Sequence, residues 1–181
     1  MAQQTFPKSP SYEAKVGEDG TFVSDTKTFP TFDGMDLPVH LLRGITAFGF
    51  QEPTAIQQRV IGPFVRGVDV VAQAPSGAGK TAAFVIATLQ RLDFGRRQCQ
   101  ALILSPTREL ALQTQEMCSG IGQYMHDGRT FCHTFIGGTP IRDEKEKIKQ
   151  GVLVAVGTAG SCRRCDATRL APHSSPSRPC H

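Results

Sequence analysis

The sequence predicts an α/β fold in which helices cover both faces of a parallel sheet. Short apolar segments alternate with longer segments of helical periodicity between residues 68 and 156. The apolar segments 101–105 and 152–156 show no apolar–polar alternation, which is typical of parallel strands buried on both faces. A glycine-rich turn at 74–79 joins one expected strand to one expected helix. These observations indicate βαβ units and a three-layer domain.

Two helices are expected before the first of these strands. Asp36 can cap the first helix, Pro38 suits its first turn, and Gly49 is a plausible C-terminal stop. The second helix should begin near Pro53 and break at Gly62-Pro63, because proline removes a backbone donor and clashes with the preceding turn.

The rest of the fold follows from the alternating pattern. Four strands are expected where apolar residues run together, at 68–73, 101–105, 130–136 and 152–156. Three helices are expected between them, at 80–92, 107–119 and 141–149.

The composition is that of a soluble globular domain, with 39% hydrophobic and 20% charged residues among 181. The net charge is +4, but residues 161–181 carry +3 of it, so the remainder has no basic stripe that alone would indicate nucleic-acid binding. No apolar run reaches membrane-spanning length and Met1–Pro10 lacks the apolar core of a signal peptide, so we expect a cytoplasmic or nuclear protein with no membrane partner.

The segment from Ala74 to Thr81, Ala-Pro-Ser-Gly-Ala-Gly-Lys-Thr, is the most informative motif. A glycine-rich turn between a strand and a helix presents backbone N–H groups and a helix N-terminus to phosphate oxygens. Lys80 would reach the β- and γ-phosphates of a nucleotide, and the Thr81 hydroxyl would be a ligand of Mg²⁺. We therefore predict a nucleoside triphosphate site at Ala74, Gly77, Ala78, Gly79, Lys80 and Thr81.

A second candidate feature precedes this loop. Gln57 closes the segment that starts at Gly49, and Phe32 lies upstream. A glutamine amide can pair with an adenine edge, and an aromatic ring can stack on the base. Taken alone, Gln57 on a polar helix face is more often simply solvated. Its position beside a phosphate loop favours adenine recognition.

Further motifs lie where expected strands end: Pro106-Thr-Arg-Glu-Leu110, Gly137-Gly138 and Gly157-Thr-Ala-Gly160. Ligands of open α/β sheets collect at the carboxyl ends of strands. In this order, the motifs make the chain resemble the first RecA-like domain of a DEAD-box RNA helicase, within the translation-initiation-factor branch and its nuclear relatives. The resemblance runs from Phe32 to Thr158, and Ala74 is the family's own form of the loop.

The resemblance implies ATP and Mg²⁺ as cofactors and RNA as a partner, with no catalytic residue assigned in this chain. By position, RNA phosphates would be held by Pro106, Thr107 and Arg108, the RNA backbone would approach closely at Gly137 and Gly138, and a further contact would involve Thr158 and Gly160. Taken alone, Arg108 and Glu109 are better explained as a solvated pair, and the two glycines as a tight turn; the ordered series of motifs favours the functional interpretation.

The sequence departs from the family after Thr158. The family motif Thr-Pro-Gly-Arg is Thr-Ala-Gly-Ser at 158–161, and no Asp-Glu-Ala-Asp segment or second RecA-like domain follows. The change of composition resembles translation in another reading frame or an aberrant splice. Cys162 and Cys165 with His173, Cys180 and His181 offer a zinc site as an alternative, although the second half lacks the usual spacing.

The chain is therefore expected to have four regions: a disordered arm at 1–30, adenine-recognition helices at 31–66, a partial RecA-like P-loop domain at 67–158 whose sheet is incomplete at its C-terminal end, and an aberrant disordered tail at 159–181. The function expected for the family is ATP-dependent RNA unwinding, and this chain is expected to be a truncated, inactive and monomeric member. The alternatives are a non-catalytic nucleotide- or RNA-binding module that contacts translation-initiation or RNA-processing proteins, and an unstable product without function.

Overall fold

The computed structural model describes residues 15–16, 22–23, 28–96, 98–126, 128, 130–138 and 140–164. Its α-helices are α1 (Val39–Ala47), α2 (Ala55–Val65), α3 (Lys80–Arg91), α4 (Arg108–Ile121), α5 (Ile141–Gly151) and α6 (Ala159–Arg164). Its strands are β1 (Lys15–Val16), β2 (Phe22–Val23), β3 (Ala101–Ser105), β4 (Cys132–Phe135) and β5 (Val154–Thr158). Two short 3₁₀ turns are η1 (Asp33–Met35) and η2 (Gly122–Tyr124).

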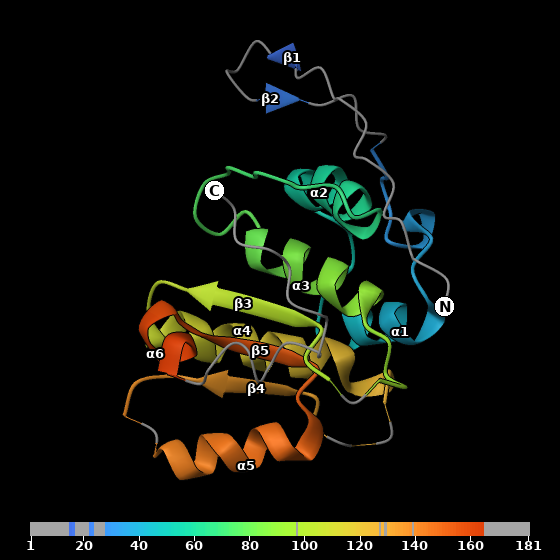
Figure 1. Cartoon of the computed structure of the whole chain (residues 1–181). Coiled ribbons are helices and arrows are strands. Elements are labelled where there is room, and N and C mark those ends of the chain that lie inside the picture. The colour runs from blue at the N-terminus through green and yellow to red at the C-terminus, as the bar shows by residue number, and fades with distance from the viewer. Residues whose placement is uncertain are drawn as a thin grey trace, which may run out of the picture.

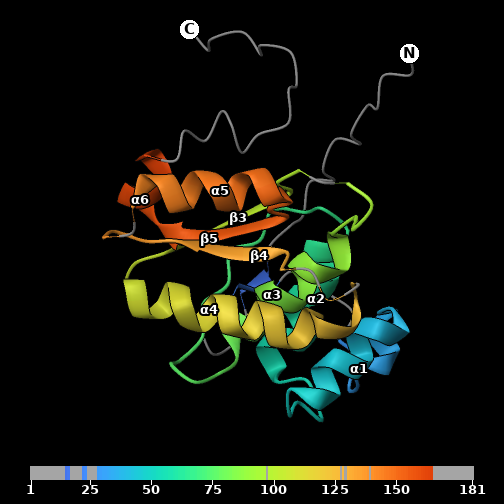
Figure 2. The same ribbon diagram turned by 90° about the horizontal axis from the view of Figure 1, so that it is seen from below.

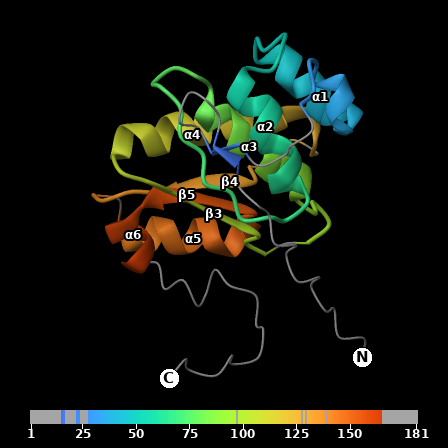
Figure 3. The ribbon, with the colours of Figure 1, turned by 90° about the horizontal axis from the view of Figure 1, so that it is seen from above.

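The main sheet is parallel and has the strand order β3-β5-β4 (Figure 1). Seen from below, α5 and α4 lie on opposite faces of this sheet (Figure 2). The view from above shows α1, α2 and α3 on the same side as α4 (Figure 3). The α/β class and the parallel sheet expected from the sequence are thus confirmed.

The register of the strands determines which side chains face each side of the sheet. Residues at alternate positions of a strand face opposite sides of a sheet. Ile103 of β3 lies opposite Val156 of β5, and both join the larger core beside α3 and α4. Ala155 faces the other side, where it packs with Phe135 of β4 and Ile148 of α5.

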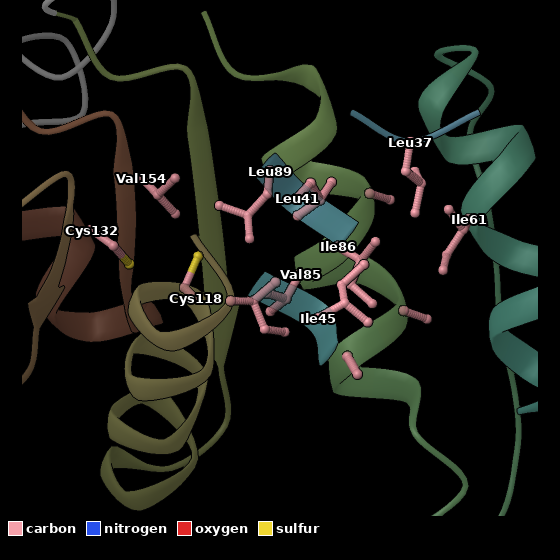
Figure 4. Packing of buried hydrophobic residues seen from close by; sticks show 14 of the residues in the cluster. Leu37, Leu41, Ile45, Ile61, Val85, Ile86, Leu89, Cys118, Cys132 and Val154 are labelled. Atoms are coloured by element: carbon pink, nitrogen blue, oxygen red, sulfur yellow. The ribbon is translucent and has the colours of Figure 1, made fainter. Parts of the chain in front are cut away.

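The larger core gathers around α3. Val85, Ile86 and Leu89 on that helix are completely buried. Figure 4 shows them between Ile61 of α2 on one side and Cys118 of α4 with Val154 of β5 on the other. Burying a large aliphatic side chain contributes about 1.5–3 kcal/mol, so this shared core stabilises α3, whose first residue is Lys80.

The predicted helices form with small differences at their ends. Helix α1 ends before Gly49, whose φ of 105° suits a glycine after a helix C-terminus. Helix α2 does not break at Gly62-Pro63, so that expectation was wrong: Pro63 lies inside the helix, which runs to Val65. Pro63 is buried in the last turn, where the lost hydrogen bond comes too late to stop the helix.

The strand predicted at 68–73 is absent, which corrects the sequence analysis. Residues 68–75 have no strand pairing, and Val71 is fully exposed. A strand needs a hydrogen-bonded neighbour, and apolar composition alone does not supply one. In the described sheet β3 is an edge strand, and its Leu102 and Leu104 are 48% and 56% exposed. Segment 68–73 is thus unpaired, and β3 has a neighbour, β5, on one side only.

The two ends of the chain also differ in part from expectation. Within the arm at 1–30, β1 and β2 form a short antiparallel pair, which polar composition did not suggest. Within the tail at 159–181, residues Ala159–Arg164 form α6 directly after β5. The zinc alternative joins Cys162 to Cys165, His173, Cys180 and His181, and the last four lie outside the described residues. Among described residues, no helix is long and apolar enough to cross a membrane.

Candidate functional site

The predicted phosphate loop leads directly into α3. Gly77 and Gly79 have φ angles of 79° and 88°, a region that glycine adopts without steric cost. Gly79 is the N-cap, so α3 begins at Lys80. The first turn of a helix leaves backbone N–H groups without intrahelical partners and carries a partial positive charge. This end of α3 therefore has the geometry of an anion site.

The ammonium group of Lys80 lies over the same loop. Its Nζ donates hydrogen bonds to the carbonyl oxygens of Ala74 at 2.5 Å and Pro75 at 2.7 Å. An ammonium has three donors, so one remains available. Lys80 thus forms hydrogen bonds to carbonyls of its own loop, and an incoming phosphate would compete with these two carbonyls for the ammonium group.

Two side chains at the start of α2, those of its N-cap Thr54 and of Gln57, join this helix to the loop. Thr54 Oγ1 donates to the Ala78 carbonyl at 2.9 Å, and Gln57 Nε2 donates to the Gly79 carbonyl at 3.3 Å. Gln57 Oε1 accepts the Thr54 backbone N–H at 2.9 Å, which forms a capping box at the start of α2. A Cβ on Gly79 would lie 2.6 Å from Gln57 Nε2, so only glycine permits this close approach.

The sequence analysis did not identify Thr54 as a loop contact. The signal was present, because Thr54 and Gln57 have the threonine-to-glutamine spacing of a capping box. That pattern predicts a helix start, and only the fold shows that the same two residues meet the phosphate loop.

Phe32 and Thr81 occupy different surroundings. The ring of Phe32 is 4% exposed and belongs to the core, so a stacked base would have to displace its present neighbours. Thr81 is half-buried in the first turn of α3, next to Lys80. The structure therefore places Thr81 at the loop and does not present an open face of Phe32.

The other predicted contacts meet at the carboxyl edge of the sheet. Pro106 and Thr107 follow β3, and Thr107 caps α4 by accepting the Leu110 N–H at 3.3 Å. Arg108 and Gly138 come together, because a Cβ on Gly138 would lie 3.4 Å from Arg108 Nη2. Gly138 also has a φ of 94°. The two motifs are more than 25 positions apart in the sequence and are adjacent in space.

In the described part of the chain, Arg108 forms no ion pair with a carboxylate. The ion pairs found in the described part of the chain join Arg96 to Asp93 and Arg142 to Glu146, and neither involves Arg108. The Glu109 carboxylate accepts its own backbone N–H and a hydrogen bond from Thr107, which lowers its pKa. The charge of Arg108 also lowers this pKa, so an anion bound at Arg108 would share the guanidinium with the Glu109 carboxylate.

The end of β5 completes this edge. Thr158 Oγ1 donates to Ser161 Oγ at 3.2 Å, and the Ser161 side chain is buried. Gly137 is half-buried, whereas Gly160 is exposed with open space where a Cβ would be. Packing therefore does not require glycine at position 160.

Comparison with known proteins now decides the family. The sequence profile described as "DEAD/DEAH box helicase" matches residues 54–171, which is more than half of the chain. The chain belongs to the DEAD/DEAH-box helicase family. The match starts later and ends later than the resemblance at Phe32–Thr158, so it includes α6 and part of the segment expected to be an aberrant tail.

The relatives indicate the eIF4A-like branch. The chain is 52% identical over 144 residues to the probable eukaryotic initiation factor 4A of Trypanosoma brucei brucei, covering 79% of this chain and 35% of the relative. It is 47% identical over 148 residues to eukaryotic initiation factor 4A-1 of Arabidopsis thaliana, covering 82% and 35%. The chain thus spans about a third of the length of these relatives.

Solved structures support the RecA-like fold of this family. Dbp5 of S. cerevisiae, bound to RNA and ADP BeF3, matches with a TM-score of 0.67 and 32% identity, covering 80% of this chain and 36% of that one. A DEAD box protein from Methanococcus jannaschii matches with a TM-score of 0.68 and 30% identity, covering 80% and 39%. The predicted fold class and family are confirmed.

Proposed function

We propose that this chain forms the nucleotide-binding half of an ATP-dependent RNA helicase site. The observation that carries the proposal is the loop itself, in which Gly77 and Gly79 shape the turn and Lys80 opens α3. Family membership implies the use of ATP. The β- and γ-phosphates would replace Ala74 and Pro75 as partners of Lys80, while backbone N–H groups of the first turn of α3 bind the remaining oxygens.

We propose that adenine is read by Gln57. Its Oε1 and one hydrogen of Nε2 are engaged by Thr54 and Gly79. One lone pair of the oxygen and one N–H remain, which is the pair of groups that an adenine edge requires. Because the side chain is 1% exposed, the base would have to insert beside it.

Mg²⁺ fits this site mainly through phosphate oxygens. Thr81 supplies a hydroxyl in the first turn of α3. Among described residues, no group of three or more His, Cys, Asp or Glu side chains could hold a metal ion. When bound, Mg²⁺ neutralises developing charge on the transferred phosphoryl group.

RNA phosphates would bind at the carboxyl edge of the sheet. Arg108 and Gly138 are adjacent there, and Thr158 and Gly160 lie at the end of β5, the neighbouring strand. One solved relative is itself described as bound to RNA. The guanidinium supplies the charge for a phosphate, and Gly138 allows the backbone of RNA to approach.

A polypeptide of these 181 residues is expected to bind nucleotide without turning it over usefully. Phosphoryl transfer requires groups that position water and stabilise charge on the γ-phosphate. Lys80 and Thr81 supply only part of this set. The competing candidate, a binding module without catalysis, is favoured for this polypeptide by the unpaired segment 68–73 and the exposed edge of β3. Its partners would be proteins of translation initiation or RNA processing in the cytoplasm or nucleus.

The nucleotide proposal is tested by displacement of a fluorescent ADP analogue with ADP and with GDP. We expect ADP to compete at least tenfold better than GDP. Lys80→Ala should weaken binding of both, whereas Lys147→Ala on α5 is the matched control and should leave it unchanged. Equal competition by ADP and GDP would remove the adenine assignment, and unaltered binding by Lys80→Ala would remove the phosphate-loop assignment.

The RNA proposal is tested separately by the salt dependence of single-stranded RNA binding. Arg108→Ala should reduce affinity and lower the salt slope by about 1, the change expected for one lost phosphate contact. Arg142→Ala on α5, a residue that lies within 3.9 Å of Glu146, is the control and should change neither quantity.

A further inference from the structure

A buried histidine that the proposed site does not use lies beneath α5. His133 of β4 is 9% exposed. It is two positions from Phe135, so both side chains face the same side of the sheet, and it pairs in register with Ala155 of β5. Ile148 of α5 packs against the cluster that contains Phe135 and Ala155, and Figure 2 shows α5 along this face. His133 therefore lies in the layer between the sheet and α5.

The surroundings of the His133 ring favour its neutral form. Nε2 is buried and, among the described residues, has no hydrogen-bond partner. Neither ion pair found in the described part of the chain involves His133, so no carboxylate there balances a positive ring. An imidazolium carries a proton on both nitrogens, and burial of such a charge without a partner is unfavourable.

The elements packed around this ring supply no negative charge. Strand β5, which pairs with β4, has no titratable side chain. Cys99, which packs against the same cluster, is a neutral thiol at pH 7 because burial raises its pKa. The exposed carboxylates described on α5 belong to Asp143 and Glu146, whereas Lys147 is half-buried.

Lys147 acts in the same direction as burial. Burial, and then the positive charge of Lys147, lower the pKa of His133, and a hydrogen bond with the backbone of Thr130 opposes them. Protonation of the ring would therefore add a second positive charge to the layer that α5 covers.

Helix α5 has little apolar surface to hold it on the sheet. Of its described side chains, Ile148 is the one that packs against the smaller cluster, whose buried members are Phe135, Val152 and Ala155. Helix α3, by comparison, contributes Val85, Ile86 and Leu89 to the larger core. Elements with few buried apolar contacts open locally at a lower free energy than the rest of a fold.

We propose that His133 is a pH-sensitive latch, which holds α5 on the sheet while the ring is neutral and releases α5 when the ring is protonated. In the opened state the ring meets water and takes up a proton near pH 6.5, the value for a free histidine. Opening then binds up to one proton, so the opening equilibrium rises by up to about tenfold for each pH unit below 6.5. The larger core around α3 stays folded.

Release of α5 would also free one end of the segment that joins it to β4. This segment contains Gly137 and Gly138, and Gly138 lies beside Arg108. A loss of RNA affinity at acid pH would rest on the proposed RNA contacts. The latch itself depends only on how α5 packs, so the two proposals can fail separately.

The test is amide hydrogen exchange of the whole chain at pH 7.5 and pH 5.5, with each rate divided by that of the unstructured peptide at the same pH. We expect the protection of α5 to fall by about three- to tenfold, and that of α3 by less than about twofold. His133→Gln removes the titration and should give α5 the same protection at both pH values. His40→Gln is the matched control, because His40 is exposed on α1, and it should keep the fall of the unaltered chain.

Two results with the unaltered chain would overturn the proposal, even if His133→Gln fails to fold. One is a fall in the protection of α5 that is no larger than that of α3. The other is α5 amides without protection at pH 7.5, since the helix would then be released while the ring is neutral. A folded His133→Gln chain that keeps the full fall in α5 protection would also contradict the proposal.

Discussion

Replacement of Gln57 by alanine should weaken both the fold and nucleotide binding, because this side chain joins α2 to the phosphate loop. Gln57 Oε1 accepts the Thr54 N–H at 2.9 Å and its Nε2 donates to the Gly79 carbonyl at 3.3 Å. The side chain is 1% exposed, so water does not replace it readily. Alanine removes both hydrogen bonds together.

The size of the effect follows from these two bonds. Loss of the capping interaction costs about 0.5–2 kcal/mol. Leaving the Gly79 carbonyl without its donor costs about 1–3 kcal/mol. Gln57→Ala should therefore lower the free energy of unfolding by roughly 2–4 kcal/mol and move the urea midpoint by about 1–2 M. The same substitution distorts the phosphate loop and so weakens ADP binding. A loss of about 1.4 kcal/mol of binding free energy lowers affinity tenfold, and we expect ADP affinity to fall more than tenfold.

The assay is urea unfolding followed by far-ultraviolet circular dichroism, together with ADP titration. Gln58→Ala is the matched control, because Gln58 Nε2 donates to the Pro53 carbonyl at 3.0 Å and does not touch the loop. It should cost about 0.5–1.5 kcal/mol and leave ADP affinity unchanged. The reasoning is refuted if Gln57→Ala behaves like Gln58→Ala in both measurements.

Three further predictions concern other parts of the molecule. Gly138→Ala should lower stability by about 1–2 kcal/mol in urea unfolding, because its φ is 94° and the new Cβ would lie 3.4 Å from Arg108 Nη2; unchanged stability would contradict the strain. Burial, and then the charge of Lys147, lower the pKa of His133 in the folded chain. The free energy of unfolding should therefore be highest above about pH 6.5, the value for a free histidine, and should fall as the pH drops below it. His133→Leu should reduce the difference between the free energies of unfolding measured at pH 7.5 and pH 5.5. Leu104→Lys should reduce light scattering on concentration, because it places a charge on the exposed edge strand β3; equal scattering would exclude this edge as the contact.

Much of the fold could be predicted from local pattern. Residues 101–105 form a strand as expected, and the glycine-rich turn leads into a helix at Lys80. These features depend on neighbours in the sequence. The segment at 68–73 has strand composition but no strand, because pairing depends on which other segment lies beside it. The helix likewise continues past Pro63 to Val65, because whether a proline ends a helix depends on where in the helix its missing donor falls.

The candidate site shows the same division. Lys80 could be found from its motif, since the loop chemistry lies within eight consecutive residues. The contact of Arg108 with Gly138 depends on the parallel order of β3, β5 and β4, which brings distant strand ends together. The burial of Phe32 and the bond from Thr54 to Ala78 depend on tertiary packing that periodicity does not specify.

The most direct test of the central claim is amide hydrogen exchange of this chain with and without ADP and Mg²⁺. The claim is that the loop before α3 binds the phosphates of an adenine nucleotide. We predict slower exchange at the amides of Gly77 to Thr81 with ADP, and little change with GDP at the same concentration. Unchanged exchange of these amides at an ADP concentration that saturates binding would contradict the claim.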